Sequence, residues 1–421
     1  MAAKETGKPK GRNLLGAGLI TGASDDDPSG IATYSQAGAQ FGYALGWTLV
    51  VTYPLMVAVQ MISARIGRTT GLGISGNVRR HYPAWLLVGI VALLLAANVI
   101  NLGADLGAMA DASRLVVPLP PVVLLPAFAL FCAITQIVMR YARYVALLKW
   151  LTLALLAYVA TLFIVHLSWR DAAIGLLVPQ LSWSRDRLMT IVAIFGTTIS
   201  PYLFFWQASE EAEDIRTLGE RALKAAPGQG PAALRRIGID TMAGMAASNL
   251  VALAILLTTA ATLNPAHVTD IQTSAQAAEA LRPVAGAYGS ILFALGIVGT
   301  GLLAVPVLAG SAAYAIAEAL GWPAGLSRRP RQAKAFYATI ATATLIGTAL
   351  NFTPVNPIRA LFWTAVINGV IAVPVMAIMM LLSQCEKVMG KFVLEGPLKW
   401  FGWLATALMA AVVVALGVSS F

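Results

Sequence analysis

GAGLITGASDDDPSGIATYSQAGAQFG, residues 16–42, is long and apolar enough for a membrane helix, yet three aspartates and a proline stand near its centre. A proline within a helix has no N–H, so Pro28 leaves the carbonyl of Ser24 without its intrahelical partner. Inside a membrane an unpaired carbonyl costs several kcal/mol, so such a break persists only where another group satisfies it. The stretch therefore predicts a broken helix built around a polar site.

A second stretch follows the same plan. Residues 191–214 read IVAIFGTTISPYLFFWQASEEAED, again apolar with a proline near the middle. Pro201 leaves the Thr197 carbonyl without a partner for the same reason. Two interrupted helices in corresponding positions are typical of a membrane transporter whose binding site lies between them.

The composition indicates an integral membrane protein throughout. The chain has 421 residues and is 58% hydrophobic and 11% charged, whereas about a quarter of a soluble chain is charged. Its apolar spans are long enough to cross a hydrocarbon core of about 30 Å, given some tilt. We predict an all-α fold with eleven transmembrane helices, at residues 14–40, 43–64, 84–113, 119–139, 145–167, 188–213, 237–262, 285–319, 335–351, 357–384 and 398–420.

The two broken helices divide these spans into repeats. Residues 1–167 hold the first five predicted helices and residues 188–384 the next five, and each set begins with a broken helix. Because five is an odd number, the second set must enter the membrane in the opposite direction. We therefore predict two inverted repeats in a single transport domain, with the eleventh helix, at 398–420, outside the repeats.

The basic residues test the number and direction of the helices. Cytoplasmic loops of membrane proteins are rich in Lys and Arg. If the N-terminus is cytoplasmic, most of the 29 Lys and Arg residues fall on that side. The exceptions are Arg114, Arg170, Arg185, Arg187, Arg282 and Arg359. We expect a multi-pass protein of the cell (inner) membrane, in contact with the lipid bilayer, with its C-terminus on the extracytoplasmic side.

Several classes of function have no support in the chain. Membrane-flanking residues explain the formal net charge of +10, so no nucleic-acid partner is expected. The chain has no phosphate-binding loop and no Ser/His/Asp arrangement on a soluble scaffold, so it is not expected to be an enzyme. Neither the two cysteines nor the three histidines are placed to bind zinc at mid-membrane. No cofactor and no obligate protein partner are expected.

The residues around the two prolines supply oxygen ligands for a cation. Asp27 directly precedes Pro28 and puts a carboxylate beside the freed carbonyls of Ser24 and Thr197, while Ser200 adds a hydroxyl. Charged side chains inside a membrane are rare and usually functional. We interpret these groups as an all-oxygen cation site. The alternative is that both prolines only kink their helices.

Other acidic residues allow more than one interpretation. Asp25 and Asp26 cannot share the face of the third aspartate, so we expect them to line the aqueous approach to it. Asp105, inside the third span, fits a cation pathway or coupling site as well as it fits a satisfied interhelical hydrogen bond. The acidic run that contains Glu210 and Glu211 is either a solvated face or an exit funnel that concentrates cations.

Together these motifs resemble the Nramp family of divalent metal transporters over nearly the whole chain. The first helix of that family carries Asp-Pro-Gly-Asn, matched here by Asp27–Gly30, and its sixth carries Met-Pro-His-Asn, matched by Ser200–Leu203. Further similar segments are 41–71, 104–106, 240–241 and 356–358. The resemblance implies a LeuT-like fold with metal ligands at Asp27 and at the carbonyls of Ser24 and Thr197, which the prolines free independently.

The chain departs from the family at four positions of interest. Gly30 replaces the Asn ligand and Ser200 replaces the Met ligand, so the soft thioether is missing. Oxygen ligands suit Mg²⁺ and other hard ions, whereas a thioether favours softer transition metals. Tyr202 stands in place of the sixth-helix His, and Ala108 replaces the acidic residue expected three positions after Asp105. In the family both are linked to proton coupling, and the pattern resembles the Nramp-related magnesium transporters.

We therefore expect a transporter of Mg²⁺, and also of Mn²⁺, that carries a partly hydrated ion without proton coupling. The smaller residues leave room for water, and Mg²⁺ usually retains several waters. The alternative is a proton-coupled Mn²⁺ or Fe²⁺ importer of the ordinary Nramp type, in which Asp105 carries the proton. A sodium-coupled amino-acid symporter is disfavoured because Asp27 would repel the substrate carboxylate. A metal-sensing receptor is disfavoured because the chain has no signalling module.

Overall fold

The computed structural model describes residues 17–138, 153–180 and 182–419, and every regular element within these ranges is helical. Eight stretches of the described residues are long and apolar enough to cross a membrane, judged by length and composition. They are Pro28–Thr70, Ala84–Ser113, Pro121–Val138, Arg185–Thr217, Pro227–Thr262, Ser274–Leu320, Pro357–Gln384 and Pro397–Val418.

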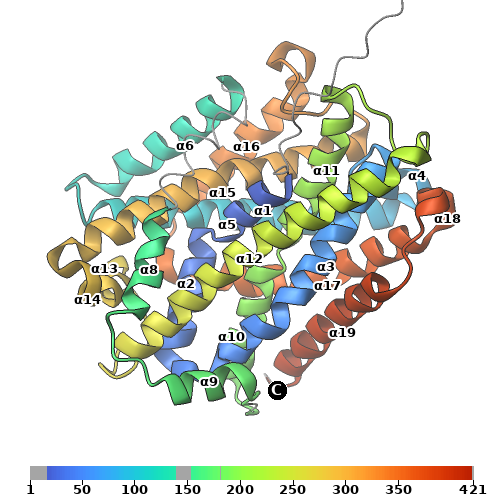
Figure 1. The fold of residues 1–421 in the computed structure, drawn as a ribbon. Helices are drawn as coiled ribbons and strands as arrows, with labels where there is room; N and C mark the ends of the chain where they lie inside the picture. The colour runs from blue at the N-terminus through green and yellow to red at the C-terminus, as the bar shows by residue number, and fades with distance from the viewer. Residues whose placement is uncertain (1–16, 139–152, 181, 420–421) are drawn as a thin grey trace, which may run out of the picture.

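The α-helices are connected by short loops and 3₁₀ turns. In chain order they are α1 (Ala17–Asp25), α2 (Pro28–Phe41), α3 (Gly46–Thr70), α4 (Ile74–His81), α5 (Ala84–Ser113), α6 (Pro121–Val138), α8 (Leu156–Leu162), α9 (Trp169–Leu177), α10 (Arg185–Thr198), α11 (Pro201–Thr217), α12 (Gly230–Thr262), α13 (Ser274–Ala278), α14 (Arg282–Ala285), α15 (Gly289–Leu320), α16 (Lys334–Leu350), α17 (Pro357–Gln384), α18 (Glu386–Met389) and α19 (Pro397–Val418). Figure 1 shows the long helices packed side by side.

Each of the eleven predicted spans contains at least one helix of the described residues. The first and sixth spans hold two helices each, α1 with α2 and α10 with α11. Residues 14–16, 139, 145–152 and 420 of the predicted spans lie outside the described residues. The all-helical membrane architecture is confirmed, and the number eleven stays a prediction. α8 and α16 are too short to be among the eight stretches, and the stretch Pro28–Thr70 takes in helices of both the first and the second predicted span.

The first predicted break lies at the aspartates and the proline. α1 ends at Asp25 and α2 begins at Pro28, so the proline occupies the first position of α2, which its fixed φ suits. Asp27 is extended, with φ −69° and ψ 168°, as the steric demand of a following proline favours. Its side chain accepts a hydrogen bond from the Gly30 N–H and so caps α2. The break expected within 24–30 is confirmed.

The second predicted break has the same backbone plan but a different cap. α10 ends at Thr198 and α11 begins at Pro201. Ser200 is extended, with φ −81° and ψ 129°, and its side chain does not cap α11. Instead the Ser200 hydroxyl donates to carbonyls of α10, 2.8 Å from Gly196 O and 2.9 Å from Thr197 O. The helix is therefore broken as predicted, and the serine itself satisfies the freed carbonyls.

Close helix packing encloses both breaks. α12 crosses both halves of the first broken helix (Figure 1), and a Cβ added at Gly22 of α1 or Gly38 of α2 would overlap the α12 backbone. Small residues allow membrane helices to approach this closely. On the other sides, α5 packs against α15 and α17, α11 against α3 and α15, and α10 against α17. The breaks therefore lie in the interior.

The outer helices expose large apolar side chains on the surface of the molecule. Val138 on α6, Leu345 on α16 and Trp400 on α19 are large apolar residues that are strongly exposed. The apolar central part of the second broken helix is almost entirely buried by comparison. An apolar exterior around a polar interior is what a lipid environment selects, because only there does exposed apolar surface carry no penalty.

Candidate functional site

Asp27 joins the two broken helices to α5. Its Oδ1 accepts hydrogen bonds of 2.7 Å from both the Gly30 N–H and the Ser29 hydroxyl. Its Oδ2 accepts from Asn101 Nδ2 on α5 at 3.1 Å and from the Tyr202 hydroxyl on α11 at 3.4 Å. The side chain is 1% exposed. The four donors are neutral, so the carboxylate is a buried charge that hydrogen bonds solvate and that a cation would match electrostatically.

The carbonyl that Pro28 frees has a partner from the other broken helix. The Tyr202 hydroxyl donates to Ser24 O at 2.9 Å while it also approaches Asp27. Thr197 O, freed by Pro201, accepts from Ser200. The two carbonyls are therefore free of backbone partners, as the proline argument requires, but each is held by a hydroxyl in this conformation. A cation that used Ser24 O would have to displace the Tyr202 hydroxyl.

Gly30 lies beside Thr197 of the second broken helix. A Cβ at this position would lie 3.2 Å from Thr197 Oγ1, 3.4 Å from Tyr34 Cε2 and 3.5 Å from Asp25 O. The sequence predicts room for water beside this glycine, but the Thr197 hydroxyl and the Tyr34 ring border that position. The site is small and closed in this conformation, and room for water has to come from movement of these side chains.

The predicted ligands are all buried together. Ser24, Asp27, Thr197 and Ser200 are each at most 2% exposed. Among the described residues no group of three or more His, Cys, Asp or Glu is arranged to hold a metal ion. The donors that the breaks do bring together are one carboxylate, backbone carbonyls and hydroxyls, which are hard oxygen ligands.

Family comparison covers nearly the whole chain. Residues 18–419 match the sequence model of the Nramp family, described as natural resistance-associated macrophage protein-like. The chain belongs to the Nramp family.

Curated relatives of this Nramp protein carry the name divalent metal cation transporter MntH. The relative from Acidiphilium cryptum is 26% identical over 431 residues, which cover 100% of this chain and 92% of the relative. The relative from Pectobacterium carotovorum is 27% identical over 301 residues, which cover 69% of this chain and 68% of the relative.

Solved structures with the same architecture are more distant in sequence. A histidine-to-alanine mutant of the Eremococcus coleocola manganese transporter has a TM-score of 0.77 and 17% identity, and the match covers 97% of this chain and 88% of that one. Mhp1, a nucleobase-cation-symport-1 family transporter in a closed conformation, has a TM-score of 0.58 and 12% identity, with 96% and 93% covered. At these identities the likeness shows the fold, and the predicted LeuT-like fold is confirmed.

Asp25 and Asp26 face α12 in this Nramp chain. The Ser248 hydroxyl lies 2.6 Å from Asp25 Oδ2 and 3.0 Å from Asp26 Oδ1. Asp25 is 1% exposed and Asp26 is 7% exposed. They do lie on a different side from Asp27, as expected. In this conformation, however, they are packed against a helix and do not border an open aqueous approach.

Asp105 lies one turn beyond Asn101 on the same face of α5. It is fully buried, and neither carboxylate oxygen has a hydrogen-bond partner among the described residues. The sequence left a satisfied interhelical hydrogen bond open as an explanation, and the structure does not supply one within those residues. The pathway or coupling role of Asp105 stays a prediction, now with a geometric basis.

The acidic run at the end of α11 is not a solvated face. Glu211 is buried and forms an ion pair with Arg236 of α12. Glu213 is also buried and accepts hydrogen bonds from the Tyr314 hydroxyl and from backbone N–H groups after α15. Glu210 is half-buried, with Tyr314 Oη at 3.4 Å. The solvated-face interpretation is wrong because neighbouring helices supply partners, and a pathway role for these glutamates stays a prediction.

Sequence reasoning missed two residues at the breaks. Tyr34 follows Gly30 by four positions, one helical turn, so its place beside the site had a local signal. Ser248, which binds two aspartates, had none, because it is 223 residues from Asp25 along the chain.

Proposed function

We propose that this Nramp protein transports divalent metal ions and that Mg²⁺ is its principal substrate, with Mn²⁺ also carried. The names of its relatives, divalent metal cation transporter and manganese transporter, support the class of substrate. The observation that carries the choice of Mg²⁺ is the donor set at the breaks, in which Asp27 is accompanied by oxygen atoms from both broken helices. Such a set suits a hard cation.

The departures from the family pattern support the same choice. At Ser200 the chain has a hydroxyl that is already engaged with α10, where the family has a thioether. At Tyr202 it has a phenol that binds Ser24 O and approaches Asp27. A site without a soft ligand gains little from a transition metal, while Mg²⁺ binds through one or two carboxylates and keeps several waters. We therefore assign this chain to the Nramp-related magnesium branch.

We further propose that transport is not coupled to protons. A tyrosine at position 202 does not exchange a proton near neutral pH as a histidine does. Ala108, in place of the family's acidic residue, removes a second proton carrier. The ion therefore moves down its own gradient.

Proteoliposomes that contain the purified protein test both proposals. We expect Mg²⁺ uptake to follow the Mg²⁺ gradient, to be unchanged by an imposed pH gradient, and to leave the lumenal pH constant. Uptake that requires a pH gradient, or an absence of Mg²⁺ flux beside robust Mn²⁺ flux, contradicts the assignment.

A proton-coupled Mn²⁺ or Fe²⁺ importer is the second candidate. The carboxylate of Asp105 favours it, because it is buried without a partner among the described residues and is therefore suited to carry a proton. If this candidate holds, lumenal acidification accompanies Mn²⁺ uptake in the same proteoliposomes and disappears in Asp105→Asn.

The Ser200→Met variant should change ion preference. It supplies the thioether that the family carries at this position, so we expect the Mn²⁺ to Mg²⁺ transport ratio to rise by roughly tenfold, the ratio that ~1.4 kcal/mol of added coordination energy produces. Metal competition assays in proteoliposomes measure this ratio. Ser200→Ala is the matched control, since it removes the hydroxyl without adding sulfur. An equal ratio in both variants would show that no ligand stands at this position.

We also propose the inverted repeats, 1–167 and 188–384, with 398–420 outside them. The shared plan of the two breaks supports the repeat, because each places an extended residue before a proline that starts the next helix. The positive-inside pattern supports a cytoplasmic N-terminus and an extracytoplasmic C-terminus. The orientation can be tested in cells with a tag at the C-terminus. Cleavage of the tag by a protease added from the extracytoplasmic side is expected.

A further inference from the structure

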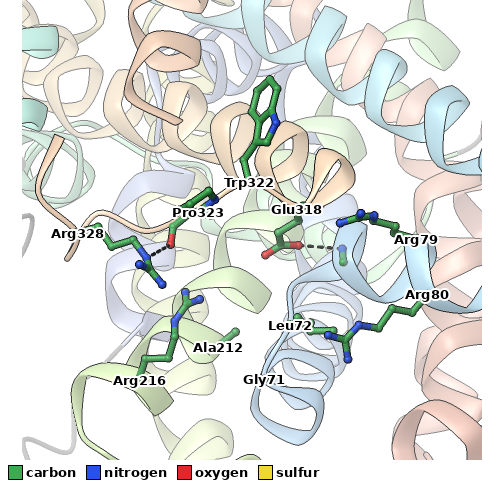
Figure 2. A pocket seen from close by; sticks show the side chains of 13 residues that line it. Gly71, Leu72, Arg79, Arg80, Ala212, Arg216, Glu318, Trp322, Pro323 and Arg328 are labelled. Carbon is green, nitrogen blue, oxygen red and sulfur yellow. Dashed lines mark hydrogen bonds between the residues drawn. The ribbon is translucent and has the colours of Figure 1, made fainter. Parts of the chain in front are cut away.

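Four arginines converge on one pocket at the end of α11. The pocket has a volume of about 680 Å³, within the ~300–1,000 Å³ range of small-molecule sites. Figure 2 shows Arg216 and Arg328 on one side of it and Arg79 and Arg80 on the other. These side chains come from α11, from the loop after α15 and from α4, three separate parts of the chain.

The positive charge of this arginine pocket is not balanced within it. None of the four arginines forms an ion pair with another described residue. Glu318 lies between them (Figure 2), but its carboxylate accepts hydrogen bonds from Gly73 N–H, Gly76 N–H and the Ser209 hydroxyl at 3.0–3.1 Å. Four guanidinium groups therefore lie near one carboxylate that is already hydrogen-bonded, and arginine is suited to bind phosphate groups through paired N–H donors.

This arrangement differs from ordinary membrane-flanking charge. Arg68, also near the end of a long helix, is buried and bound to Glu220 and Gln229. The pocket arginines instead have exposed side chains around a shared cavity. Self-repulsion among like charges disfavours such convergence unless an anion offsets it.

An apolar groove begins at the same place. It has a volume of about 300 Å³ and lies between α5, α15 and α16, with Val99, Ile316, Ala338 and Ile346 among its walls. Trp322 lines both the arginine pocket and this groove. Because α16 starts just after the arginine-bearing loop, the groove leads away from the charges.

The length of the groove matches one leaflet of a bilayer. Its α16 wall runs from Ala335 to Ile346, about 16 Å at 1.5 Å per residue. Half of a hydrocarbon core of about 30 Å is about 15 Å. A tryptophan at the boundary between a charged and an apolar site is typical of the membrane–water interface. A soluble phosphate would use the pocket but would leave the groove without a role.

We propose that an anionic phospholipid binds here, with its phosphate among Arg79, Arg80, Arg216 and Arg328 and an acyl chain in the groove. Trp322 lies at the level of the glycerol backbone between the two. The site is on the side that the charge distribution assigns to the cytoplasm, where basic pockets between helices bind anionic headgroups. The bound lipid fastens the end of α11, the second half of a broken helix, to α4 and to the loop after α15.

Native mass spectrometry of the full chain, purified in detergent, tests this site with phosphatidylglycerol, phosphatidylcholine and inorganic phosphate as separate probes. We expect selective retention of phosphatidylglycerol. Arg216→Gln with Arg328→Gln should weaken it roughly 25-fold, because each arginine near an anionic headgroup contributes about fivefold. Ala338→Phe, which fills the groove at an exposed position and leaves every charge in place, should weaken it as well.

The matched control is Arg329→Gln with Arg331→Gln, two exposed arginines of the same loop that do not line the pocket. This variant should retain the lipid as the unmodified protein does. Equal loss in the control, or equal retention of phosphatidylcholine, would overturn the lipid site. Competition by inorganic phosphate together with no effect of Ala338→Phe would replace it with a soluble-anion site. These binding readouts do not depend on metal transport.

Discussion

Asp27→Asn is expected to abolish metal transport while the protein stays folded. The asparagine keeps an oxygen that accepts from Gly30 N–H and Ser29 Oγ, so the cap of α2 survives, and Asn caps helices about as well as Asp. What disappears is the carboxylate that contacts both broken helices. Flux of Mg²⁺ into proteoliposomes should fall by roughly 100-fold or more, since loss of even an outer-shell partner lowers metal affinity 10–100-fold.

Two further variants, one at Asp27 and one at a control position, separate the loss of charge from the loss of structure. Asp27→Ala removes the cap as well, which should lower stability by ~1 kcal/mol in addition to abolishing transport. Asp171→Asn, at an exposed aspartate on α9, should leave flux and melting temperature unchanged. Normal flux in Asp27→Asn would mean that the carboxylate serves only as a helix cap and that the cation site is elsewhere.

Arg236→Met is expected to lower the free energy of unfolding by about 3–5 kcal/mol, the loss typical when one partner of a buried ion pair is removed. Glu211, its partner, is 1% exposed, and Arg236 is 19% exposed. Asp214 and Asp240 also interact electrostatically with Arg236, and Asp240 holds the start of α1 through Gly18 N–H at 2.7 Å. The variant therefore leaves the buried Glu211 carboxylate without the Arg236 guanidinium, close to Asp214 and Asp240, where α1, α11 and α12 meet.

Denaturant unfolding in mixed micelles measures this loss of unfolding free energy. Two control variants show whether the loss comes from the buried ion pair. Arg235→Met changes the neighbouring exposed arginine and should alter stability by less than ~0.5 kcal/mol. Glu211→Leu combined with Arg236→Met removes the stranded carboxylate of the pair and should recover most of the stability, because apolar replacements of buried pairs are often neutral. Equal losses in Arg235→Met and Arg236→Met would show that the pair is not buried in solution.

The two breaks were predictable because their causes are local. Each depends on a proline and on the residue before it, and the steric rules that govern them act over about five residues. Asp27 could therefore be placed beside the freed Ser24 carbonyl from the sequence, and the structure has both in contact with Tyr202. The apolar spans were predictable for the same kind of reason, since length and hydropathy alone decide which helices can cross a membrane.

The partners of the polar groups were not predictable in this way. The Tyr202 hydroxyl and Asp27 are 175 residues apart, and Asn101 is 74 residues from the same carboxylate. Nothing near Glu211 in the sequence indicates that Arg236 will pair with it, so the sequence left both a solvated face and an exit funnel open. Burial of a charge depends on what faces it, and facing residues come from other helices.

The chain by itself determined where its helices span and where two of them break, because a missing N–H and a run of apolar residues act on the nearest turns. Only the tertiary structure decided which distant groups meet. It places Tyr202 against the Ser24 carbonyl and Ser248 against Asp25 and Asp26, and, away from the breaks, it gathers four arginines around one pocket. These pairings follow from helix packing, which brings distant residues to within a hydrogen bond of each other and so sets the electrostatics of the interior.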